Sequence, residues 1–464
     1  MAKKYFLSFT LWLVVFFWII TQAFAQAPSA ELQKRIDDLE KQVNELKLLL
    51  QEQQKARAEE KARVDKVEQK VDQAEKSKAT SPSVVSTVSS IISDFKFKPY
   101  GFIKLDAAHD GRRVYPSSGN FILYVPNGQT THQKHESFSM TARETRLGLY
   151  ILAPETYSWV AKGRVEIDFY GDATTHESKA NVLLRHAYVE LTKGNFGIIA
   201  GQTSDLISPL YPSTVNYTVG WGVGNIGYRH PQVRFTYTHP FNDRNKLISA
   251  IAITRTKGLI NEDLDLDLKN DGEDAGYPTV QARLAYATKL FRVEKESVFG
   301  VSGHYGKEKI DWSQVQTGFH QETPKTWSVN GDFEISLTSC LSIKGEGFLG
   351  YNLDDYFGGI LQGINADKTQ KQFTSIIKSI GGWTQLTYQY NKWKYNVGAG
   401  IDDPRNLDLS AGMRSRNTFY FGNFYYNLIP PVNLCLEYSY WDTDYIRKSD
   451  GINNRIQASA IYSW

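Results

Sequence analysis

The sequence predicts an all-β transmembrane barrel of about 16 antiparallel strands, preceded by an N-terminal α-helical coiled coil. Three observations predict this fold class: the composition, an N-terminal export signal, and alternation of apolar and polar residues over 95–464. Aromatic residues form 13% of the 464 residues and 35 are glycine, yet mean hydropathy is −0.41. Several helical spans are excluded, because each needs about 20 consecutive apolar residues. Membrane strands instead interleave apolar with polar residues.

The charge and the cysteine content narrow the class further. The formal net charge is +3, from 53 Lys+Arg and 50 Asp+Glu, whereas nucleic-acid binders are strongly and locally basic. Two cysteines exclude a disulfide scaffold. We place Cys340 and Cys435 four strands apart, or about 19 Å along the wall at ~4.8 Å per strand, and therefore predict no disulfide.

Residues 1–25 are predicted to be a signal peptide. Lys3 and Lys4 precede an apolar run over 6–20, and A-F-A at 23–25 fits a cleavage site. The alternative is an uncleaved anchor helix, for which this run is short. No other stretch reaches 18 apolar residues, so any further membrane segment must be a strand.

Residues 26–77 are predicted to form a periplasmic coiled coil. Apolar residues recur at spacings of 4, 3, 4, 3 and 4, as in a heptad seam: Leu32, Ile36, Leu39, Val43, Leu46 and Leu50. The alternative is a solvated single helix. β-Branched residues at the a positions favour two strands, which conflicts with the trimer expected below. Residues 78–94 resemble a flexible linker.

Residues 95–464 are predicted to form the barrel. Ile456, Ala458 and Ala460 share one face of the last strand, and Arg455 and Gln457 the other, before a terminal aromatic residue. Alternation alone would also suit a soluble sandwich. Here, however, short turns alternate with long loops at 110–137, 204–229, 258–276, 307–325 and 352–375, as in bacterial outer-membrane barrels. Sixteen strands are wide enough for an aqueous channel.

Charged residues opposite the apolar ones are expected to line the lumen. They are Arg146, Lys162, Arg164, Glu166, Asp168, Arg234, Arg283 and Lys344, with Arg185 in a strand that alternates poorly. Guanidinium groups in a narrow wet pore attract carboxylates and phosphates. The alternative is that these arginines pair with lumenal acids and stiffen the wall.

Two long loops carry further candidates. Loop 204–229 is apolar, so we expect it to fold inward and narrow the barrel through Leu206, Leu210, Tyr211 and Trp221, unless it lies on a neighbouring subunit. Loop 258–276 is acidic, but it lacks the spacing of an EF-hand, so a solvated loop is favoured over a divalent-ion site. We predict no metal site, no cofactor and no enzyme, since H-E-x-x-H, P-loop and G-x-S-x-G motifs are absent.

Several short motifs resemble the DcaP-like outer-membrane porins. They are Y-G-F-I-K-L-D at 100–106, A-R-E-T-R-L-G at 142–148, L-R-H-A-Y at 184–188, G-Q-T at 201–203 and P-Q-V-R at 231–234. The resemblance implies a homotrimer in the bacterial outer membrane, a periplasmic coiled coil, and anionic solutes such as dicarboxylates. It also implies pore-lining roles for Arg143, Arg146, Arg185 and Arg234.

The expected function is passive diffusion of small hydrophilic solutes, with a preference for small anions. One alternative is a nonselective general porin of the same fold, in which arginines and acids cancel. Another is a structural tether, with the coiled coil linking outer-membrane lipid and cell wall. No nucleic-acid partner is expected.

Overall fold

The computed structural model describes residues 95–116, 119–128, 135–171, 179–256, 263–291, 293–314, 320–367 and 369–464. All of them belong to the compact unit Ser89–Trp464. The predicted signal peptide (1–25), the coiled coil (26–77) with its seam, and the linker (78–94) lie outside the described residues.

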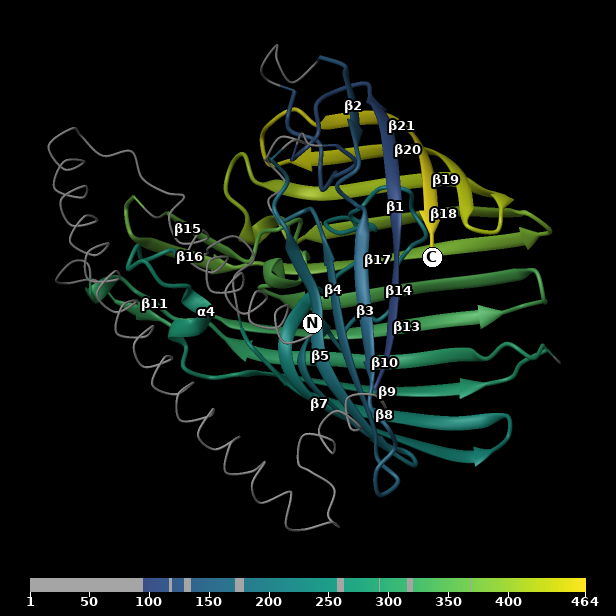
Figure 1. Ribbon diagram of the computed structural model, residues 1–464. Helices are drawn as coiled ribbons and strands as arrows, with labels where there is room; N and C mark the ends of the chain where they lie inside the picture. Colours follow the sequence, from purple (N-terminus) through teal and green to yellow (C-terminus); the bar gives the residue numbers. More distant parts are fainter. Residues whose placement is uncertain are drawn as a thin grey trace, which may run out of the picture. The chain divides into compact units, whose positions relative to one another are not determined.

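The strands form a closed antiparallel barrel with 16 positions around its wall (Figure 1). Strand β1 pairs with β21 from Phe102↔Ser463 to Asp110↔Arg455 and so closes the sheet. The predicted all-β barrel and its strand number are therefore confirmed. In chain order the wall segments are β1 (Lys96–Asp110), β2 (Ser137–Thr141), β3 (Arg146–Leu152), β4 (Val160–Asp168), β5 (Leu183–Lys193), β6 (Phe196–Ser204), β7 (Arg229–Asn242), β8 (Asn245–Thr254), β9 (Thr279–Thr288), β10 (Ser297–Lys307), β13 (Lys325–Ser336), β14 (Leu341–Tyr351), β17 (Lys378–Tyr390), β18 (Trp393–Pro404), β19 (Arg414–Ile429), β20 (Val432–Tyr445) and β21 (Gly451–Ser463).

The second wall position holds two segments, because β2 and β3 pair with opposite ends of β1. Residues 138–153 are therefore two strands and not the single continuous strand that their alternation predicts. The chain turns between the segments, where the Thr145 amide donates to Ala142 O at 3.0 Å. The Thr145 hydroxyl accepts from the Lys104 amide at 3.2 Å and holds the turn against β1.

The outer face of the wall is apolar and the inner face polar. On β21, Ile456 is 54% exposed, whereas its neighbours Arg455 and Gln457 are fully buried. This alternation repeats along β20 and β21 and suits a wall with lipid outside. No helix in the described ranges is long and apolar enough to cross a membrane.

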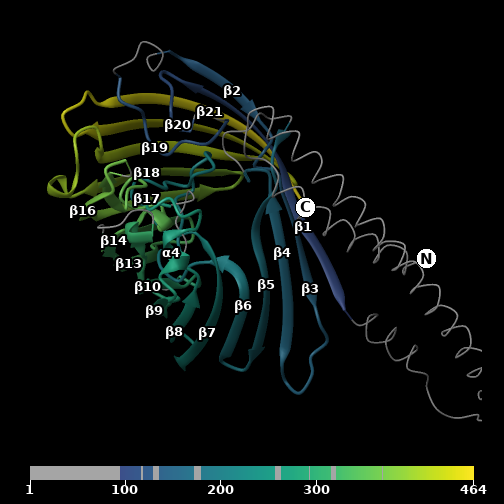
Figure 2. The same ribbon diagram turned by 90° about the vertical axis from the view of Figure 1, so that its left-hand side faces the viewer.

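Short and long connections lie at opposite ends of the barrel, as Figure 2 shows. The short ones are 153–159, 194–195, 243–244, 289–296, 337–340, 391–392 and 430–431. The long ones contain the smaller elements β11 (Ile310–Asp311), β12 (Gln321–Glu322), β15 (Ile364–Asp367), β16 (Gln372–Ile376), the helix α4 (Asp271–Asp274) and the 3₁₀ turns Trp312–Gln314, Asp354–Tyr356 and Asn406–Asp408. By the usual rule, the short turns face the periplasm.

Apolar clusters lie inside the barrel, where parts of four long connections meet the wall. Val114, Ile122 and Val125 pack on Phe419 and Trp441. A second cluster joins Phe121, Leu123, Tyr170, Tyr217, Trp221 and Phe357, and a third joins Ile207, Ile226, Phe348, Leu353 and Tyr356. Burial of these side chains explains why the loops fold inward rather than into water.

Cys340 and Cys435 are both free thiols, so the prediction of no disulfide is confirmed.

Candidate functional site

The connection 205–228, here called the inner loop, reaches the strands on the far side of the barrel. Its backbone amides donate to wall carboxylates and amides: Leu210 to Glu346 Oε1 at 2.6 Å, Ser213 to Gln385 Oε1 at 2.5 Å, and Val215 to Glu437 Oε2 at 2.7 Å. The polar inward positions of β14, β17 and β20 thus satisfy a backbone segment that has no strand of its own.

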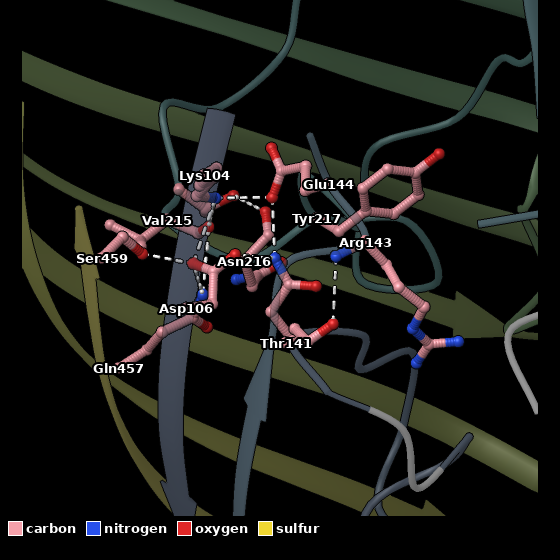
Figure 3. A network of polar contacts seen from close by, with 12 residues as sticks. Lys104, Asp106, Thr141, Arg143, Glu144, Val215, Asn216, Tyr217, Gln457 and Ser459 are labelled. Carbon is pink, nitrogen blue, oxygen red and sulfur yellow. Dashed lines mark hydrogen bonds and ion pairs between the residues drawn. The ribbon is translucent and has the colours of Figure 1, made fainter. Parts of the chain in front are cut away.

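Lys104 fastens the middle of the inner loop to β1, as Figure 3 shows. Its ammonium lies 2.5 Å from Glu144 Oε2, 3.3 Å from Asp106 Oδ1 and 2.7 Å from Val215 O. All three ammonium protons are therefore used within a site where Lys104 is 3% exposed. Val215 O also accepts from Gln457 of β21 at 3.2 Å.

The predicted constriction residues belong to this loop. Leu206 and Trp221 are buried, and Leu210 and Tyr211 are half-buried. The Trp221 ring stacks on Phe357 with centroids 4.3 Å apart and planes at 4°. Two of the four residues therefore pack the loop against its neighbours, whereas Leu210 and Tyr211 are the more accessible pair.

Glu166 and Asp168 of β4 are surrounded by arginines. Arg185 bridges the two acids, with Nε 2.8 Å from Glu166 and Nη1 2.7 Å from Asp168. Arg164 Nη2 lies 2.6 Å from the other oxygen of Glu166, and Arg146 Nε lies 3.6 Å from Glu166. Three guanidinium groups therefore share two carboxylates.

A β-bulge explains how Arg185 enters this group. The β4–β5 register shifts between Glu166 and Ile167, so that Glu166 pairs with His186 but Ile167 pairs with Leu184. Arg185 and His186 are consecutive and yet both buried, which regular alternation does not allow. The poor alternation seen in the sequence is thus the bulge itself.

Arg143 also turns inward at a break in the wall. It lies in the turn between β2 and β3, is buried, and holds its guanidinium 4.5 Å from the ring centroid of Tyr170. Its backbone amide donates to the Thr141 hydroxyl (Figure 3). In an unbroken strand, Arg143 and Glu144 would point to opposite faces.

Arg229 and Arg234 of β7 form no ion pair with any described carboxylate. Arg234 donates to Ser204 O and to Gln232 Oε1, both neutral acceptors. Arg229 is buried, and its Nε and Nη2 have no hydrogen-bond partner among the described residues. Its guanidinium lies over the rings of Tyr228 at 4.5 Å and Trp221 at 5.6 Å.

The remaining candidates do not join this group. Lys162 pairs with Glu190 at 2.5 Å, and Arg283 makes a two-point ion pair with Asp332 at 2.5 and 3.2 Å. Lys344 donates to Tyr211 O at 2.6 Å. These three cations are neutralised or used to hold the inner loop.

Asp205 begins the inner loop immediately after β6. Burial alone would raise the pKa of its carboxyl, but neighbouring His230, 2.9 Å away, and hydrogen bonds from Gln281 and the Tyr228 amide hold that pKa below its ordinary value. Asp205 is therefore charged and hydrogen-bonded to these partners, and its charge also acts on the Arg234 guanidinium, with which it makes no ion pair.

Sequence reasoning missed Arg229 and the inward fold of residues 119–128. The signal for that fold was the apolar run 121–125 inside a long connection, the same property that marked 204–229. Arg229 is the first residue of β7, next to the long connection, so no alternation indicated its side.

The described part of the acidic connection, 263–276, is only partly solvated: Leu268 is 93% exposed, but two of the carboxylates are buried. Asp265 and Asp271 are each 1% exposed. One carboxylate oxygen each from Asp263, Asp265 and Asp267 lies within 4.8 Å of the others. These groups mainly cap their own turn and the Asp311 amide, and we assign them no ligand.

Comparisons with solved structures agree with this architecture. The outer membrane channel DcaP of Acinetobacter baumannii is 17% identical, with a TM-score of 0.62 over 80% of this chain and 98% of that one. An anion-selective porin from Comamonas acidovorans is 10% identical, with a TM-score of 0.52 over 80% and 100%. Salmonella typhi OmpF in complex with daunomycin is 13% identical, with a TM-score of 0.52 over 80% and 99%. These likenesses show a shared porin fold.

The sequence comparisons identify the family. No curated protein matches the chain significantly. The family model described as DcaP outer membrane protein matches residues 25–293, which is more than half of the chain. This match covers β1 to β9 and therefore the whole group of arginines described above. The chain belongs to the DcaP outer membrane protein family of bacterial outer-membrane channels.

Proposed function

We propose that the chain forms a water-filled channel for passive diffusion of small hydrophilic solutes and favours small anions such as dicarboxylates. The observation that carries the proposal is an excess of guanidinium groups on one sector of the wall. Arg146, Arg164 and Arg185 share Glu166 and Asp168, and the unpaired Arg229 and Arg234 stand on nearby β7.

The excess has an electrostatic consequence. At an effective dielectric constant of about 20, unit charges 4 Å apart interact by ~4 kcal/mol, well above thermal energy. A carboxylate that passes Arg234 meets a planar donor group whose present partners are neutral oxygens. A cation meets the same group as a barrier. The buried Arg229 adds a second positive charge on the same strand.

The test is the reversal potential of the purified full-length protein in a planar bilayer under a KCl gradient. We expect reversal toward the chloride potential, and a shift toward zero in Arg234→Gln. The matched control is the double variant Arg283→Gln with Asp332→Asn, which removes a neutral pair and leaves the net charge unchanged.

Each other outcome contradicts part of the proposal. Reversal near zero in the unaltered channel would indicate a general porin. Equal shifts in Arg234→Gln and in the control pair would show that the unpaired guanidinium does not set the preference. Complete absence of current steps would favour a structural tether.

We further propose that the protein is a homotrimer assembled through a periplasmic coiled coil at 26–77, after removal of a signal peptide at 1–25. The support is the heptad seam from Leu32 to Leu50. Deletion of 31–77 and sizing of the detergent-solubilised barrel tests this assembly. An unchanged trimer would show that the coiled coil does not drive it.

A further inference from the structure

Glu308, at the long-loop end of β10, is buried among other acids. It is 1% exposed, and no ion pair among the described residues includes it. One of its oxygens accepts from Asn352 Nδ2 at 2.6 Å, and the other, Oε2, has no hydrogen-bond partner. Burial and then the charges of Asp355 and Asp354 raise the pKa of its carboxyl well above the ordinary value. A buried carboxylate in such surroundings requires either a proton or a cation.

The side-chain oxygen of Asn352 favours a cation over a proton at this site. Asn352 is fully buried, and its Oδ1 also lacks a hydrogen-bond partner. A Cβ built on Gly363 would lie 2.0 Å from both Asn352 Oδ1 and Asp354 Oδ1, so these two oxygens face each other within about 4 Å. Gly363 has no left-handed backbone angle that would require glycine, so what the glycine provides is space for the converging oxygens.

The backbone around these oxygens is already fixed. The Glu308 amide donates to Pro324 O at 2.9 Å, and the Asn352 amide donates to Ile377 O at 2.9 Å. The Ile377 amide in turn donates to Gly363 O at 2.8 Å. Ligand groups held in this way lose little freedom when they bind an ion.

We propose that Glu308, Asn352 and Asp354 bind a hard divalent cation of the calcium class between the connection after β10 and the connection after β14. All candidate donors are carboxylate or amide oxygens, the donor set that Ca²⁺ accepts, and no nitrogen or sulfur donor is needed. The charges of Asp355 and Asp271 also act on Glu308 and add to the negative potential at this site.

The site also bears on the inner loop. The residues after Asp354 form the surface on which that loop rests: Tyr356 O accepts from the Gly227 amide at 2.8 Å, and Phe357 O accepts from the Gly222 amide at 3.1 Å. A bound cation would therefore brace the inner loop from the outer end of the barrel. This inference does not depend on the anion preference.

The test uses full-length protein in detergent, freed of divalent ions with EDTA and titrated with CaCl₂ at constant ionic strength. We expect calcium to raise the thermal unfolding temperature, with a dissociation constant of about 10⁻⁴ to 10⁻³ M by calorimetry, typical of extracellular sites. Glu308→Gln and, independently, Asn352→Ala should weaken binding at least about tenfold. The matched control, Asp263→Asn in the neighbouring acidic turn, should bind as the unaltered chain does.

Three results would overturn the proposal. The first is an unfolding temperature that does not respond to calcium, with Glu308→Gln indistinguishable from the unaltered chain, because Glu308 is then simply protonated. The second is calcium binding that survives both substitutions. The third is calcium binding that is lost in Asp263→Asn, which would place the ion in the acidic turn instead.

Discussion

Replacement of Lys104 by methionine is the sharpest test of how the inner loop is held. The substitution keeps most of the side-chain volume but removes the ammonium that contacts Asp106, Glu144 and Val215 O. Removal of one partner from a buried ion pair destabilises by about 3–5 kcal/mol, because uncompensated charge remains. We expect the lower end, about 3 kcal/mol, since Glu144 is 14% exposed and Asp106 keeps other donors.

The expected loss of stability sets the size of the measurable effect. About 3 kcal/mol corresponds to roughly a 100-fold larger undocked fraction of the inner loop. The loop keeps its amide contacts with Glu346, Gln385 and Glu437, so it should visit the undocked state briefly rather than leave permanently. We therefore expect Lys104→Met to add rapid open-channel current noise in planar bilayers and to speed proteolysis of 205–228 in detergent.

Two matched variants isolate the cause. Lys162→Met breaks an ion pair of equal length, 2.5 Å to Glu190, but this pair is about one-third exposed and should contribute only about 0–1 kcal/mol. Adding Asp106→Asn and Glu144→Gln to Lys104→Met should restore much of the lost stability, because no charge is left unpaired. If Lys104→Met shows the noise and proteolysis of the unaltered channel, the loop is held without this cluster and the reasoning fails.

Three further changes follow from the same structure. Trp221→Ala removes the ring stacked on Phe357, should destabilise by about 3–5 kcal/mol in urea titrations and should raise single-channel conductance; unchanged conductance would mean that the ring does not hold the constriction. Asp332→Asn leaves Arg283 without its acid and should move the reversal potential further toward chloride, with Glu190→Gln as the control near the periplasmic turns. The pKa of the Asp205 carboxyl is lower in the folded chain than in the unfolded chain, where it is near 3.9. The carboxylate therefore stabilises the fold fully above the unfolded pKa, and this contribution is lost as the pH falls through the folded pKa. The stability difference between the unaltered chain and Asp205→Asn should thus be smaller at pH 3 than at pH 5; an equal or larger difference at pH 3 would contradict this sign.

The barrel could be predicted because its physics is local and periodic. Each wall strand must alternate between lipid and water, so residues such as Ile456 and Arg455 reveal their sides without any knowledge of the neighbours. Turn residues such as Asn391 and Lys392 mark the strand ends, and their order along the chain then fixes the antiparallel neighbours.

The group of arginines could be predicted only in part, because the wall breaks its own period there. Arg143 turns inward at the interruption between β2 and β3, and Arg185 turns inward at the β4–β5 bulge. Both positions violate the alternation from which side-chain direction was inferred. Their direction depends on register between strands, which a single sequence does not specify.

Ion pairs between lumenal side chains could not be predicted from the sequence either. Whether Arg283 is neutralised depends on Asp332, which lies 49 residues further along the chain. Whether Arg229 has an acidic partner depends on the positions of all the carboxylates around it. The apolar composition of a loop predicts that the loop will be buried. It does not predict which wall residues will accept hydrogen bonds from the loop backbone.

The anchorage at Val215 ties the order of folding to the integrity of the wall. Its carbonyl accepts from Lys104 of β1 and Gln457 of β21, 111 residues before and 242 residues after it in the chain. The first and last strands are the pair whose joining closes the cylinder. The anchorage at Val215 is therefore complete only when the last strand is in place, and contacts of such long range are slow to form. The loop therefore bridges the two strands that close the barrel, and a barrel opened between them would lose this anchorage at the same time.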